Sequence, residues 1–175
     1  MRVLVAHEPP IFELLPDRDH WREVIKAAEE AFVKEGAGPA MQVFNAGFGG
    51  GQEEGGAQAE DGAAGQEPQA GPDPEMAAHL AEIGKAMAKN MEFFIGYEVP
   101  PVARYIPDFT ALQASSARVV AAVGDASEGT PMSGAALALA ERLGTVPVVF
   151  PGDHGGFGVH PEAFAARLHE VLSSW

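Results

Sequence analysis

The 175-residue sequence contains no cysteine, and it has few basic residues. Without cysteine, disulfide bonds, thiolate zinc sites and a cysteine nucleophile are all excluded. With 11 Lys and Arg against 25 Asp and Glu, the chain offers no basic face for nucleic acid or an anionic membrane, so neither is expected as a partner. No apolar run approaches the length of a membrane span, and the apolar stretch at residues 1–6 is too short for a signal peptide. A cytoplasmic protein is therefore expected.

Three short apolar stretches are typical of buried strands. They are Arg2–Ala6, Arg118–Val123 and Val146–Phe150, and Pro or Gly residues end each of them. Helical patterns follow the second and third stretches, over residues 132–143 and from Pro161 onward. Strands that alternate with helices across tight Gly/Pro turns predict an α/β fold, here a partial doubly wound parallel sheet of about three strands.

The region between the first two strands is predicted to be largely helical. An amphipathic helix is expected from residue 19 to about residue 34, and a long one from about Pro74 through Phe94. Residues 47–75 are rich in Gly and Glu, so a disordered insertion is expected there. The predicted organisation is a first strand and turn at 1–10, a helical segment at 11–115, and β/α units at 116–175. Large apolar side chains of the helical segment either line a pocket or simply pack together: Trp21, Phe44, Phe93, Phe94 and Tyr97.

Asp125 and His154 are the candidate catalytic residues. Each follows a predicted parallel strand at its carboxyl end, and neighbouring strands lie about 5 Å apart. An acid delivered there could hydrogen-bond the imidazole, fix its tautomer and stabilise its charged form. Glu128 and Glu8 are rivals for the role of the acid. No metal or cofactor is expected, because the spacing of Asp153, His154 and His160 matches no helical ligand pair.

The remaining histidines are expected to be ordinary. His160 precedes Pro161 and is predicted to cap the last helix. Surface or capping positions are predicted for the others, which are His7, His20, His79 and His169.

Four stretches together resemble the carboxyl-terminal half of the α/β-hydrolase family. They are Val3–Pro10, Gly124–Gly129, Phe150–Phe157 and His160–Leu168. In that family they would be the strand that leads into the cap domain, the acid loop, the histidine loop and the closing helix. The resemblance implies a helical cap from residue 19 to about residue 112. It also implies a hydrolase that acts on a small ester or amide without a cofactor.

The sequence departs from the family pattern at the nucleophile. The family's serine lies in Gly-x-Ser-x-Gly on a strand–turn–helix, and this sequence contains no such pentapeptide. Ser127 has the wrong spacing and lies in the acid loop. The resemblance therefore implies a hydrolase truncated before its first core strand, with its serine and oxyanion hole elsewhere.

Three functional classes remain open. The first is a hydrolase whose serine comes from sequence absent here, and the second is a non-catalytic remnant. The third is an interaction module that pairs through its first strand, since a bare strand edge readily accepts another strand. Poor solubility or self-association through that edge is expected.

Overall fold

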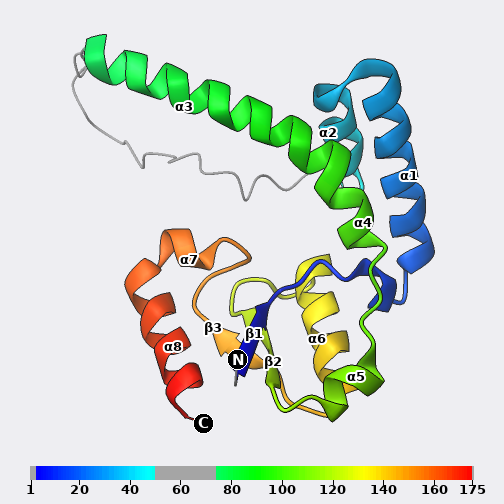
Figure 1. The fold of residues 1–175 in the computed structure, drawn as a ribbon, viewed down its shortest axis with the longest axis vertical. Helices are drawn as coiled ribbons and strands as arrows, with labels where there is room; N and C mark the ends of the chain where they lie inside the picture. The colour runs from blue at the N-terminus through cyan, green and yellow to red at the C-terminus, as the bar shows by residue number, and fades with distance from the viewer. Residues whose placement is uncertain (1–2, 50–73, 175) are drawn as a thin grey trace. The chain divides into compact units, whose positions relative to one another are not determined.

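The computed structural model describes residues 3–49 and 74–174, which form parts of two compact units (Figure 1). The first unit comprises Met1–Lys26 and Pro100–Trp175, and the second comprises Ala27–Val99. The predicted disordered insertion lies, over residues 50–73, outside the described residues. None of the helices in the described ranges is long and apolar enough to cross a membrane.

A three-stranded parallel sheet forms the centre of the first unit. Its strands are β1 (Val3–His7), β2 (Arg118–Gly124) and β3 (Val148–Phe150), in the order β1-β2-β3. This confirms the predicted α/β fold with a partial parallel sheet. The third strand is shorter than predicted: Val146 is 84% exposed, and Pro147 has no N–H to donate to a ladder.

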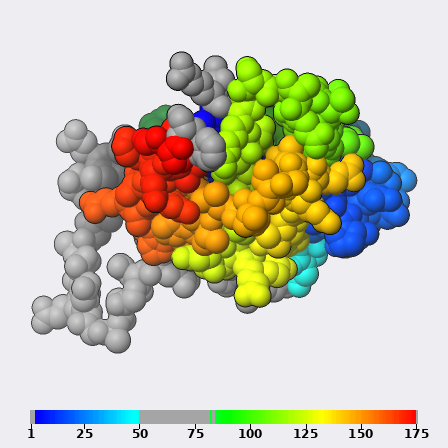
Figure 2. Space-filling view, turned by 90° about the horizontal axis from the view of Figure 1, so that it is seen from below, coloured from blue at the N-terminus to red at the C-terminus, as the bar shows by residue number. Residues whose placement is uncertain are grey.

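Helices cover both faces of the sheet. Helix α6 (Pro131–Leu143) lies on one side and α8 (Pro161–Ser173) on the other (Figure 1). The side chains of β2 alternate between the two, as the strand period of two requires. The cluster on the α6 side contains Ile11, Ala121, Leu139 and Ala140, with Ala6 packed against it. The cluster on the α8 side contains Val120, Ala122, Phe150 and Val171, with Val3, Val5, Phe164 and Leu168 packed against it. In Figure 2, α8 is the red surface beside the orange residues that precede it in the chain.

Local sequence signals fix the ends of the helices in this unit. Thr130 caps α6 by accepting a hydrogen bond from the Ser133 N–H, and Gly144 ends the same helix with φ +69°. Asp108 caps the short helix α5 (Phe109–Ala114) in the same way, through the Ala111 N–H. These are the positions at which the chain turns back toward the sheet.

Between β1 and the second unit, the chain forms the 3-10 turn η1 (Phe12–Leu14) and then enters α1 (Arg18–Glu35). The Phe12 and Trp21 rings stack with their centroids 4.4 Å apart, and both side chains are buried. Arg22 forms a forked ion pair with Glu13, with contacts of 2.6 and 2.9 Å. These contacts attach the start of α1 to the turn after β1.

The second unit is helical. Besides the second half of α1, it contains α2 (Ala37–Ala46), α3 (Pro74–Phe93) and the π-helical turn η2 (Phe94–Glu98); α4 (Val99–Ala103) follows at its border. The η2 turn packs closely on α1, because a Cβ atom at Gly96 would lie only 2.4 Å from the Phe32 ring. A larger residue would require the Phe32 ring to move, so Gly96 is a point of close contact between η2 and α1.

Candidate active site

Glu8 is a fully buried carboxylate at the carboxyl end of β1. Its N–H donates to the carbonyl of Ala122 at 2.9 Å, which extends the pairing of β1 with β2 by one residue. Its φ of +44° is the only positive value of a non-glycine residue within the described ranges. This left-handed conformation costs about 1–2 kcal/mol for a residue with a Cβ. Glu8 directly follows the last residue of β1 and precedes Pro9. Its side chain is 0% exposed.

The two oxygens of Glu8 have different neighbours. Oε1 accepts a hydrogen bond of 2.9 Å from the Gly124 N–H at the end of β2. Oε2 lies 3.4 Å from Nδ1 of His154, which is within ion-pairing distance, but among the described residues it accepts no hydrogen bond. The Glu8 side chain is 0% exposed and the His154 side chain is 53% exposed, so the carboxylate supports the imidazole from the protein side. With Nδ1 facing Glu8, Nε2 is the ring nitrogen left to exchange a proton.

The loop that carries His154 requires glycines, because backbone atoms of neighbouring residues lie very close to their Cβ positions. A Cβ atom at Gly124 would lie 2.3 Å from the carbonyl oxygen of Gly152, and one at Gly156 would lie 2.2 Å from that of Pro151. Gly152 itself has φ +82°, where side chains are rarely accommodated. The loop after β3 is therefore folded tightly over the end of β2, and this brings His154 to Glu8.

Asp125 links the loops after β2 and β3. Its N–H donates to Phe150 at 2.9 Å, and its carboxylate accepts from the Gly152 N–H at 2.8 Å. Ala126 completes the link by donating to the Gly152 carbonyl at 3.1 Å. The acid that the structure brings to His154 is thus Glu8, whereas the Asp125 carboxylate binds the backbone two residues before His154. The catalytic roles assigned to Asp125 and His154 remain predictions.

His7 does not occupy the surface position that the sequence predicted. It continues the alternation of Val3 and Val5 and lies on the α8 side of the sheet, where its ring meets Phe150 and Phe164 edge-on at 5.6 and 5.0 Å. Its Nε2 is buried and, among the described residues, has no hydrogen-bond partner. Burial is the main cause that lowers the pKa of His7, and nearby His154 lowers it further; Glu8 and Asp153 oppose the shift.

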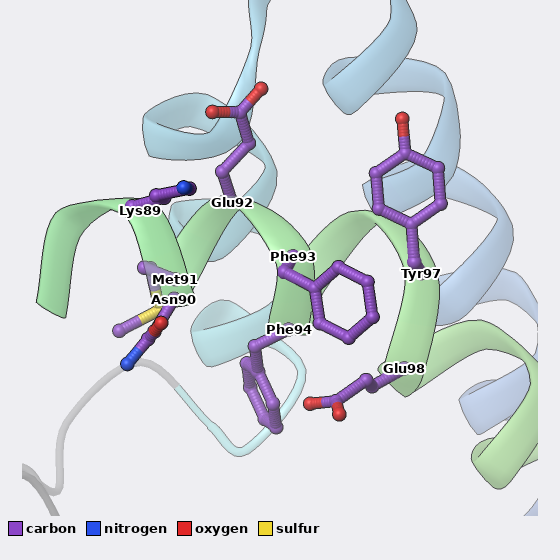
Figure 3. A pocket seen from close by; sticks show the side chains of 8 residues that line it. All are labelled: Lys89, Asn90, Met91, Glu92, Phe93, Phe94, Tyr97 and Glu98. Carbon is purple, nitrogen blue, oxygen red and sulfur yellow. The ribbon is translucent and has the colours of Figure 1, made fainter. Parts of the chain in front are cut away.

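A separate apolar groove of about 880 Å³ lies along α3 and η2 in the second unit (Figure 3). Its apolar lining consists of the side chains of Met91, Phe93, Phe94 and Tyr97, all of which are exposed. Of the aromatic residues that the sequence offered as pocket lining, Trp21 and Phe44 are instead buried. Of the five aromatic residues, two therefore pack in the protein interior, and the other three line an exposed groove.

Within residues 3–49 and 74–174, no group of three or more His, Asp or Glu side chains is arranged to hold a metal ion. The site near His154 offers one imidazole and one carboxylate in contact, which is suited to proton transfer.

The fold and this pair define an α/β protein with a histidine–carboxylate site at the carboxyl edge of a parallel sheet. Over 96 residues, which are 53% of the chain, the sequence is 35% identical to a Bacillus subtilis (strain 168) protein named "Uncharacterized hydrolase YraK". The match covers 35% of that protein, so the chain spans about a third of its relative. The chain is thus similar to a hydrolase over about half its length. No protein-family model matches the sequence, and no solved structure shows a significant match.

Proposed function

We propose that this chain carries the acid–base part of an α/β-hydrolase active site that acts on a small ester or amide. In this proposal His154 is the general base and Glu8 is the acid that orients it. The nucleophilic serine comes from sequence outside these 175 residues. The observation that carries the proposal is the 3.4 Å contact between His154 Nδ1 and the buried Glu8 carboxylate, at the edge of a parallel sheet where such folds place their chemistry.

The pair is suited to activating a hydroxyl. Nε2 of His154 would take the proton of the serine as its oxygen attacks the substrate carbonyl, and would then pass that proton to the leaving group. The imidazolium formed between these two steps lies 3.4 Å from the Glu8 carboxylate. Coulomb's law gives about 5 kcal/mol at that separation for a dielectric constant of 20, and about 1 kcal/mol for water. Because His154 is half exposed, the stabilisation belongs toward the lower end of that range.

Asp125 has a different role in this proposal. By accepting the Gly152 N–H at 2.8 Å it holds the loop that presents His154, so it positions the base without touching it. The rival assignment makes Asp125 the acid that pairs with His154. The two assignments differ in which carboxylate, when neutralised to the amide, abolishes catalysis.

Two further observations support the α/β-hydrolase type. The acid, the linking loop and the histidine follow three consecutive parallel strands at the same edge of the sheet. The B. subtilis hydrolase is also much longer than the matched region, so it has room for a strand–turn–helix that carries a serine. Together they favour a hydrolase in which this chain supplies the base and its support.

The direct test restores a nucleophile. A chimera joins the whole chain to the amino-terminal part of the B. subtilis hydrolase, which would supply the serine, and is assayed with p-nitrophenyl acetate. We expect His154→Ala to lose about 10³-fold or more in kcat, and Glu8→Gln to lose up to about 10⁴-fold, as when a triad acid is made neutral. Asp125→Asn keeps an acceptor for the Gly152 N–H and should lose about tenfold at most.

His169→Ala is the matched control, because His169 is exposed on α8 and its ring nitrogen lies 3.5 Å from the Ser173 hydroxyl, away from the His154 loop. It should retain activity. A folded chimera that has no activity, or one that keeps full activity in His154→Ala, would contradict the proposal. Loss of activity in Asp125→Asn with an active Glu8→Gln would transfer the acid role to Asp125.

A second candidate function is strand pairing through β1. This strand is at the edge of the sheet, and Leu4 on it is 42% exposed. An edge strand offers unpaired N–H and C=O groups to another strand, here that of a second copy. Light scattering should show concentration-dependent association that Leu4→Lys reduces, because a charge on an edge strand disfavours pairing. A monodisperse monomer at high concentration would exclude this function.

A further inference from the structure

Three features remain outside the proposed chemistry: the apolar groove on α3, the edge of β1, and the half-buried histidine before Glu8. The groove lies on the second unit, and the structure does not show what would fill it. The edge belongs to the second candidate function above. His7 carries the inference furthest, because its contacts reach both the core and the site.

His7 occupies a position where the sequence pattern calls for an apolar side chain. Val3 and Val5 precede it on the same face of β1 and pack in the cluster under α8. The His7 ring contacts Phe150 and Phe164 of that region. A histidine with a buried, unpartnered Nε2 is unfavourable there, since a valine or leucine would fill the space without a desolvated polar atom. Unlike a valine or leucine, however, the imidazole of His7 has a second flat face, which is not covered by the phenylalanines and can stack on another ring.

That ring lies almost parallel to the imidazole of His154. The two centroids are 6.3 Å apart and the planes are inclined by 21°, within the range of offset aromatic stacking. His154 therefore has two supports: the Glu8 carboxylate at Nδ1 and the His7 ring beside its face. Glu8 faces Nδ1 of the imidazole from 3.4 Å without a hydrogen bond in the described structure, so it leaves rotation of the ring plane open. A flat neighbour restricts that rotation.

We propose that His7 is a positioning residue that holds the plane of the His154 ring so that Nδ1 faces Glu8. It acts as a flat ring packed between the phenylalanines and His154, and it exchanges no proton with substrate. This role rests on the proposed function, because the orientation of His154 matters to catalysis only if His154 is the base.

The experiment measures the tautomer of His154 in the chain itself. In a neutral imidazole near a carboxylate, the proton is held on the nitrogen that faces the carboxylate, here Nδ1. Nitrogen-15 chemical shifts of the ring report which nitrogen carries the proton. We expect the Nδ1–H form to be the major one in the wild type and to become minor in Glu8→Gln, which is the positive control.

Two substitutions at His7 separate a flat ring from simple filling of space. His7→Leu fills the site and restores the apolar alternation, but removes the ring, so the Nδ1–H form should lose its majority. His7→Phe keeps a flat ring and should keep that majority. Val5→Ala, on the same face of β1, weakens the same cluster without touching His154 and should also keep it.

Each outcome decides the proposal. An unchanged tautomer ratio in His7→Leu overturns it, and so does a loss of the majority in His7→Phe or in Val5→Ala. The tautomer ratio of His154 is measured without any substrate turnover. A chimera without esterase activity would therefore refute the proposed function while the tautomer ratios still tested the role of His7.

Discussion

Gly152→Ala tests the physical basis of the His154 loop without changing any group that could do chemistry. Gly152 has φ +82°, and a Cβ atom there would lie 2.9 Å from Cα of Gly156 and 2.9 Å from Cδ2 of His160. The substitution therefore adds backbone strain and a steric contact at once. Both would be relieved only by moving the loop away from the end of β2, and His154 would move with it.

Two matched glycines separate these costs. Gly144 has φ +69° and open space around its Cβ position, so Gly144→Ala carries the strain alone, about 1–2 kcal/mol. Gly158 has neither a positive φ nor a neighbour within 4 Å, so Gly158→Ala should be neutral or slightly stabilising. Gly152→Ala adds overpacking, about 1–3 kcal/mol, to the strain. The total for Gly152→Ala is about 2–5 kcal/mol.

Urea unfolding measures the three free energies on one scale. Fluorescence of Trp21, which is buried against Phe12, reports on the unit that contains the loop. With a slope of about 2 kcal/mol per molar urea, the midpoint should fall by about 1–2.5 M for Gly152→Ala. It should fall by about 0.5–1 M for Gly144→Ala and stay unchanged for Gly158→Ala. If Gly152→Ala were no more damaging than Gly144→Ala, the close packing of this loop would be refuted. Equal midpoints for Gly144→Ala and Gly158→Ala would show that a positive φ carries no measurable strain for alanine in this chain.

Three further outcomes follow from named contacts. Glu8→Ala should lower the free energy of unfolding by about 2–4 kcal/mol, because it leaves the buried Gly124 N–H without its acceptor and opens a cavity; Glu8→Gln, which keeps that acceptor, should cost less in the same urea assay. Because burial lowers the pKa of His7 below 6.5 in the folded state, the unfolded chain binds its proton first as the pH falls. The free energy of unfolding should then decrease from about pH 6.5 downward until the folded-state pKa is passed, and His7→Phe should remove that part of the pH dependence. The hydrogen bond from Arg22 lowers the pKa of Glu13, so Arg22→Gln should return the NMR titration of Glu13 toward 4.5, and an unchanged titration would show that the ion pair does not persist in solution.

Most of the core sheet was predictable because its signals are local. Apolar runs that end at Pro or Gly located all three strands, and the helices on the two faces followed from residue periodicity. The start of β3 was wrong by two residues, since apolar character at Val146 is indistinguishable in sequence from strand character. Only the structure shows that this side chain is in solvent while the strand begins at Val148.

The site was less predictable because it depends on long-range placement. His154 was found from its strand-end position and its flanking glycines, but its acid could not be chosen among Asp125, Glu128 and Glu8. The strand order suggests that the acid should come from β2, next to β3, whereas the structure brings Glu8 across the end of β2 through a left-handed turn. No propensity rule predicts that turn for a glutamate.

The inward orientation of His7 is predictable from the local sequence. Val3, Val5 and His7 alternate on one face of a strand, and that alternation alone indicated an inward side chain. The aromatic neighbours of His7 come from β3 and α8, about 150 residues further along the chain, and no local pattern could supply them.

The backbone at Glu8 has a consequence for how this sequence can drift. A glycine would adopt φ +44° with less strain than any other residue, so the main chain alone favours glycine there. The glutamate present here therefore opposes a conformational preference, and its carboxylate makes a compensating contact by accepting the Gly124 N–H at 2.9 Å. Glu8→Gly would relieve the backbone strain, but it would also remove the acceptor of the buried Gly124 N–H.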